Sequence, residues 1–143
     1  MRKPFVSIIA GLTLLFVIGG SCKKKSSTPP PPPPPTEANL VVTLTPAANS
    51  VQPAAPQADF PLTIAITSTM PAQGVTIVIS AKKDDGSGAA AFFNANSNST
   101  SPNNNFSITG TPTNVVCLAT VTVTSVSKPT NTWTGSFRYS RKP

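Results

Sequence analysis

The run VVCLATVTVT, residues 115–124, decides the fold of this chain. Its odd-numbered positions are all apolar (Val, Cys, Ala, Val, Val), and its even-numbered positions from 120 onward are all threonine. Side chains alternate between the two faces of a β-strand, and β-branched residues favour that conformation. The run therefore predicts a strand that buries one face and presents a row of hydroxyl groups on the other.

Six further runs show the same period of two, separated by turn sequences such as DDGSG at residues 84–88 and KPTN at residues 128–131. These runs lie at residues 39–45, 60–67, 75–80, 89–94, 106–108 and 133–140. We therefore predict an all-β fold, a single antiparallel β-sandwich of about seven strands over residues 37–143. Its strand number and spacing resemble the immunoglobulin-like and fibronectin-like modules of bacterial surface proteins, without the paired inter-sheet cysteines of antibody domains.

The stretch NANSNSTSPNNN, residues 94–105, interrupts the pattern because it consists almost entirely of Asn, Ser, Thr and Pro. Asn and Pro are depleted from β-strands. We therefore expect a long polar loop here. The composition favours a flexible connection, and the alternative is a loop that contacts a ligand or a partner.

Residues 1–21 have the pattern of a secretory signal peptide. A positive start (Met1-Arg2-Lys3) is followed by fourteen apolar or small residues, FVSIIAGLTLLFVI at 5–18, and then by Gly-Gly-Ser. The apolar run is shorter than the roughly twenty residues that a permanent transmembrane helix needs. We therefore expect the segment to be removed after export.

Cys22 follows these small residues directly. This junction resembles the lipobox of bacterial lipoproteins, where cleavage leaves a lipid-modified cysteine as the new N-terminus. Ser21 fits the small residue expected before that cysteine, whereas Gly19 stands where the family usually has an aliphatic residue. The resemblance implies that Cys22 carries acyl chains such as palmitate. The alternative is ordinary signal cleavage, which leaves Cys22 unmodified.

Residues 22–36 then form a linker, in which three lysines at 23–25 precede seven prolines at 29–35. Consecutive prolines adopt polyproline II, so the run gives a semi-rigid spacer of about 22 Å, at about 3.1 Å per residue. The lysines would lie at the headgroup level of a membrane. We expect a lipid-anchored cell-envelope protein, most consistent with a bacterial outer membrane, and the sequence leaves periplasmic or surface display undecided.

Charge and composition weigh against nucleic-acid binding and catalysis. The net charge is +7, but residues 37–143 hold six basic against four acidic residues, a net charge of only +2. The chain has no histidine, so it lacks Ser-His and Cys-His nucleophile systems and histidine metal sites. Asp84 and Asp85 lie in DDGSG, which is more typical of a turn than of a calcium loop. We therefore expect no catalytic residue, no metal and no cofactor.

Two side chains remain as candidates for chemistry or binding. Cys117 shares its predicted strand face with apolar residues, which favours a buried structural role over a reactive thiol. Trp133 could stack on a sugar, but it has the parity of the predicted core. Our leading hypothesis is a non-enzymatic envelope lipoprotein that displays its sandwich for adhesion, scaffolding or protein contact. The alternative is a glycan-binding accessory lipoprotein of a polysaccharide-capture system.

Overall fold

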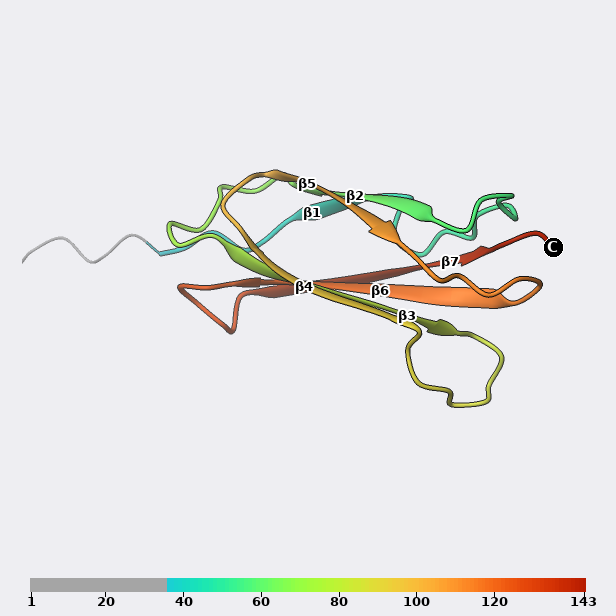
Figure 1. The fold of residues 1–143 in the computed structure, drawn as a ribbon. Coiled ribbons are helices and arrows are strands. Elements are labelled where there is room, and N and C mark those ends of the chain that lie inside the picture. The colour runs from blue at the N-terminus through green and yellow to red at the C-terminus, as the bar shows by residue number, and fades with distance from the viewer. Residues whose placement is uncertain (1–35) are drawn as a thin grey trace, which may run out of the picture. The chain divides into compact units, whose positions relative to one another are not determined.

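A computed structural model describes residues 36–143 of the chain. They form two antiparallel sheets that pack face to face (Figure 1). The strands are β1 (Val42–Thr45), β2 (Phe60–Ile66), β3 (Val75–Lys83), β4 (Phe93–Ser99), β5 (Asn103–Ile108), β6 (Val116–Ser125) and β7 (Thr132–Ser140). The smaller sheet has the order β1-β2-β5, and the larger one β4-β3-β6-β7.

The prediction of an all-β antiparallel sandwich with about seven strands is confirmed. The predicted signal peptide at 1–21, Cys22 and the predicted linker up to residue 35 lie outside the described residues. Within residues 36–143 there is no helix with the length and apolar character to cross a bilayer.

Strand β6 occupies the middle of the larger sheet, between β3 and β7. Its inward side chains at positions 117, 119, 121 and 123 are all completely buried. In the register, Val121 lies opposite Ile79 on β3 and opposite Gly135 on β7. Full burial of a valine or isoleucine side chain contributes roughly 1.5–3 kcal/mol. The alternation seen in the sequence therefore defines the inner face of this sheet.

An aromatic cluster joins the two sheets. Phe60 of β2 packs against Tyr139 of β7 at 4.4 Å between ring centroids, and Phe137 of β7 lies 5.8 Å from both rings. Thr111 donates a long hydrogen bond of 3.5 Å to the Tyr139 hydroxyl oxygen. Burial raises the pKa of Tyr139 to about 12, because the phenolate would lose its hydration inside the sandwich.

The segment after β1 leaves the smaller sheet and covers the outer edge of β7. The N–H of Asn49 donates to the carbonyl of Ser136 at 2.7 Å, and the N–H of Gln52 donates to the carbonyl of Arg138 at 2.8 Å. A parallel bridge joins Val51 to Arg138. The segment therefore covers this edge of the larger sheet along residues 136–140 of β7.

The two ends of the sandwich differ. The described chain begins at one end, beside the β6–β7 connection. At the other end lie the connections at residues 46–59, 84–92 and 109–115, together with the C-terminus (Figure 1). We call the first the proximal end and the second the distal end. Loops far apart in sequence thus gather at the distal end.

The prediction of a long loop at residues 94–105 is wrong. This stretch forms most of β4 and the start of β5, joined by only three residues at 100–102. In β4 the exposed Asn side chains alternate with half-buried Phe93, Ala95, Ser97 and Ser99. Pairing of β4 with β3 and of β5 with β2 satisfies the main chain and outweighs the weak strand propensity of asparagine.

The single tyrosine of the chain provides a spectroscopic test of the core. In the folded protein we expect the absorbance at 295 nm to report ionisation of Tyr139 at about pH 12, and at about pH 10 in guanidinium. Because the folded pKa is the higher one, its stabilising contribution is complete below pH 10 and is lost as the pH rises towards 12. A folded-state midpoint near pH 10 would contradict this placement.

Candidate functional site

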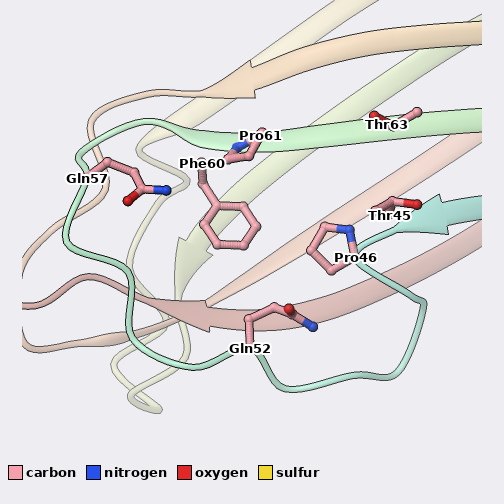
Figure 2. A pocket seen from close by; sticks show the side chains of 7 residues that line it. All are labelled: Thr45, Pro46, Gln52, Gln57, Phe60, Pro61 and Thr63. Carbon is pink, nitrogen blue, oxygen red and sulfur yellow. The ribbon is translucent and has the colours of Figure 1, made fainter.

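A hollow at the distal end lies between the end of β1 and the start of β2 (Figure 2). Its volume is about 320 Å³. It is lined by Thr45, Pro46, Gln52, Gln57, Phe60, Pro61 and Thr63. We call it the distal hollow. Figure 2 shows the rings of Phe60 and Pro46 side by side, with Gln57 next to Phe60 and Gln52 below the two rings.

The covered edge of β7 and the aromatic cluster hold the walls of the distal hollow in place. Gln52 is held by its main-chain bond to β7, and its side-chain amide donates to the Ser50 hydroxyl at 2.8 Å. Phe60 is only 8% exposed, because its ring packs on Tyr139 behind the hollow. The Thr63 hydroxyl donates to the side-chain carbonyl of Asn105 at 2.9 Å. The floor is therefore apolar, and its Phe60 ring is held by packing.

The seven lining side chains include two amides and two hydroxyls, and none of them is ionisable. Amides both donate and accept hydrogen bonds, and they match the hydroxyl groups of a neutral polar ligand. The volume lies at the lower end of the range for small-molecule sites, about 300–1,000 Å³. The distal hollow is thus suited to binding and offers no group for proton transfer at neutral pH.

Trp133, the aromatic candidate from the sequence, lies near the proximal end of β7 and away from the distal hollow. It is half-buried against the core, and its indole ring folds over Gly135 of the same strand. A Cβ atom at position 135 would lie 2.3 Å from the Cη2 atom of the ring. The absence of a side chain at Gly135 therefore leaves room for the Trp133 ring. The face of the ring that lies on Gly135 is not free to stack on a sugar.

Asp84 and Asp85 lie at the hairpin connection between β3 and β4, as the turn interpretation predicts. The Arg138 Nε atom donates to Asp84 Oδ2 at 2.6 Å, a surface pair that contributes at most about 1 kcal/mol. Asp85 Oδ1 accepts the Ser87 N–H at 3.0 Å, and hydrogen bonds from Ser87 hold the pKa of Asp85 below its usual value. The two carboxylates thus have separate partners, and residues 36–143 contain no group of three metal-ligating side chains.

Cys117 has no exposed surface and lies on the inner face of β6. Its sulfur lies 3.7 Å from the carbonyl oxygen of Val115. Burial raises the pKa of the Cys117 thiol, which disfavours the reactive thiolate. The geometry supports a structural role for this residue as a small apolar side chain.

A cluster at the proximal end was not found from the sequence. Asn131 is 7% exposed, and its amide nitrogen donates to Glu37 Oε1 at 2.6 Å and to the Ala38 carbonyl at 2.9 Å. Its side-chain oxygen accepts the Leu40 N–H at 2.9 Å. The Ser127 hydroxyl completes the cluster, donating to Glu37 Oε2 at 2.6 Å. We call these five residues the Asn131 clamp.

The Asn131 clamp holds the first described residues of the chain against the β6–β7 connection. Hydrogen bonds from Ser127, and to a smaller extent from Asn131, hold the pKa of Glu37 below its ordinary value of 4.5. The bonds join residues 90 to 94 positions apart, and the sequence around Asn131 signals only a turn. The clamp forms only when β6 and β7 pair and bring Ser127 and Asn131 next to Glu37.

No protein family model, curated protein or solved structure matches this chain. The candidate sites therefore rest on the residues and contacts described above.

Loss of the Asn131 clamp should destabilise the fold. Asn131→Ala removes three hydrogen bonds and leaves the N–H of buried Leu40 without a partner, so we expect a loss of about 2–3 kcal/mol. Denaturant unfolding followed by the fluorescence of Trp133 measures this loss. Thr130→Ala, at an exposed position of the same turn, is the matched control and should change stability little.

The same clamp predicts a dependence on pH. Because the folded pKa of Glu37 is depressed, its contribution is present above about pH 4.5 and is lost as the pH falls below that value. Glu37→Gln should remove this component of acid sensitivity. If Glu37→Gln is as acid-sensitive as the wild type, the role of the Glu37 carboxylate is contradicted. If Asn131→Ala is as stable as its control Thr130→Ala, the clamp itself is contradicted.

Proposed function

We propose that the chain is a non-enzymatic lipoprotein of a Gram-negative cell envelope that displays its sandwich for contact with another envelope component, as in adhesion or scaffolding. The observation that carries the proposal is the position of Cys22. It directly follows an apolar run and Gly-Gly-Ser, and it precedes three lysines and seven prolines. Each of these segments has a distinct role in a tethered protein.

Acyl chains on Cys22 would hold the protein at a bilayer. Each buried CH₂ group contributes about 0.8 kcal/mol, and a single chain gives only marginal binding. The resemblance to bacterial lipoproteins implies several chains on one cysteine, which is enough for durable anchoring. Each lysine at 23–25 adds about 1 kcal/mol next to an anionic surface. The proline run then separates the sandwich from the headgroups.

The geometry of the sandwich supports display of its distal end. The Asn131 clamp holds Glu37 at the proximal end, where the linker joins. The connections at 46–59, 84–92 and 109–115 gather at the opposite end (Figure 1). These connections lie at the end of the sandwich opposite Glu37, the residue that follows the proposed tether. Contact loops carried on a rigid β scaffold are a common arrangement for binding.

Lipidation has a direct test. Cells that express the full chain are grown with an alkyne fatty acid, and we expect label on the wild type and none on Cys22→Ser. The purified wild type should show no reactive thiol while folded and one after unfolding, because Cys22 is acylated and Cys117 is buried. An unlabelled wild type, or a fast-reacting thiol in the folded protein, would refute the anchor.

The distal hollow favours a second candidate, a glycan-binding accessory lipoprotein. Two glutamine amides and two threonine hydroxyls surround an apolar floor, an arrangement that matches a neutral sugar with polar edges and an apolar face. This candidate has the same proposed lipid anchor as the first one, but its partner is a glycan instead of another envelope component.

A glycan array with the purified chain tests the second candidate. We expect retention of a specific glycan and a loss of about two- to tenfold in affinity for Gln57→Ala, since one lost hydrogen bond costs about 0.5–1.5 kcal/mol. Gln73→Ala, an exposed glutamine of the β2–β3 connection, is the matched control and should bind normally. Loss of retention with Trp133→Ala alone would move the site to the proximal end, and no retention by the wild type would reject glycan binding.

A further inference from the structure

The larger sheet has one edge that the described chain leaves open. Its β7 edge is covered by the parallel segment after β1. At the other edge, β4 pairs only with β3. An open edge strand presents a row of unpaired N–H and C=O groups to any strand of suitable length.

Hydrogen bonds at the two ends of β3 show which groups of β4 point outward. The N–H of Asp84 donates to the Val116 carbonyl at 2.8 Å, and the N–H of Val126 donates to the Gly74 carbonyl at 3.1 Å. The main-chain N–H and C=O groups of the even-numbered β3 residues therefore point towards β6. These groups alternate in direction along a strand, so those of the odd-numbered β3 residues point towards β4. There they bond to the main-chain groups of odd-numbered β4 residues.

It follows that the main-chain groups of Asn94, Asn96 and Asn98 point away from the sheet. Their side chains are exposed on its outer face. Natural proteins usually protect such edges with lysine, proline, a bulge or a very short strand. Strand β4 has seven residues with the sequence FNANSNS, which contains neither a charged residue nor proline. In the smaller sheet the edge strands are shorter, with four residues in β1 and six in β5.

The sequence of this edge is nearly symmetric about Asn96. Residues 94–98 read NANSN, so an antiparallel copy places Asn94 opposite Asn98 and Asn96 opposite its own equivalent. Each outer pair joins two amides, which both donate and accept. The Asn98 side-chain oxygen already accepts the Thr76 hydroxyl at 2.9 Å, so its amide nitrogen is the group that meets Asn94. On the inner face Ala95 lies opposite Ser97, so that only small side chains meet. No like charges face each other in this register.

We propose that β4 is a self-association edge, at which a second copy of this chain pairs antiparallel about a two-fold axis through Asn96. The three outward residues of each strand form hydrogen-bonded pairs and exchange about six main-chain hydrogen bonds. The two larger sheets join into one continuous sheet. Because a single strand pair is a small interface, the association rests on the proposed lipid anchor, which concentrates copies in one membrane.

Cysteine cross-linking in the full chain tests the register. Two Cα atoms of a hydrogen-bonded antiparallel pair lie about 5.5 Å apart, within the range of about 4.4–6.8 Å for a disulfide. Asn96→Cys in an expressing Gram-negative cell should therefore shift most of the protein to a dimer band on a non-reducing gel after mild oxidation. The buried Cys117 thiol does not take part.

Matched variants separate this register from random collision. Asn94→Cys or Asn98→Cys alone should remain monomeric, because each cysteine lies about 13 Å from its equivalent along the strand. The same two variants expressed together should cross-link. Adding Asn96→Pro to both should abolish this cross-link, since proline removes an outward N–H and leaves the bonds to β3 intact.

The same gels report lipidation through the alkyne fatty-acid label. The cysteine variants are also made in a Cys22→Ala background, which we call the Cys22→Ala series. Labelled protein that gives no Asn96→Cys dimer overturns self-association and leaves the lipoprotein proposal standing. Equal dimer from all three single variants, or dimer only from Asn105→Cys on the β5 edge, also overturns it. Loss of the dimer in the Cys22→Ala series, with dimer in the labelled series, supports the proposal and its dependence on the anchor.

Discussion

Apolar burial between the two sheets is the constraint on which the rest of the structure depends. The inner face of β3 and β6 consists of Val, Ile, Ala and Cys side chains without exposed surface, and Leu62 and Ile64 of β2 close it from the other sheet. The described residues contain one cysteine, so no disulfide joins these sheets. Position 117 instead holds a thiol that behaves as a small apolar group. Cohesion therefore comes from packing, and the aromatic cluster around Phe60 extends it to the distal end.

The core also determines where polar chemistry can lie. Because β7 is the last strand of the larger sheet, its outer edge can bind the segment after β1, and that segment supplies Gln52 to the distal hollow. At the proximal end, the register of β6 and β7 brings Asn131 to the start of the domain. Both polar sites thus follow from strand pairing. A ligand in the hollow and a pull on the linker would act on opposite ends of one rigid sandwich.

The sequence predicted the strands that have one apolar face and missed features that depend on long-range pairing. Residues 115–124 carry both β-branched residues and strict alternation, so β6 was predictable. Residues 94–105 also alternate in part, as Phe93 and Ala95 do against their asparagine neighbours, but their composition has low strand propensity. Pairing with β3 overrides that propensity. The Asn131 clamp and the distal hollow join segments distant in sequence, and no local pattern marks them.

The open β4 edge explains why asparagine is used where a lysine would be the usual protection. A charged residue at position 96 would block every strand, including a second copy, whereas an amide permits pairing in the register where its own donors and acceptors are matched. Pairing of β4 with β4 is isologous, so it uses both open edges of the larger sheets and stops at two copies. The parallel segment after β1 bonds to residues 136–140 at the opposite edge of the same sheet. Within the larger sheet, pairing through β4 therefore joins two copies and no more.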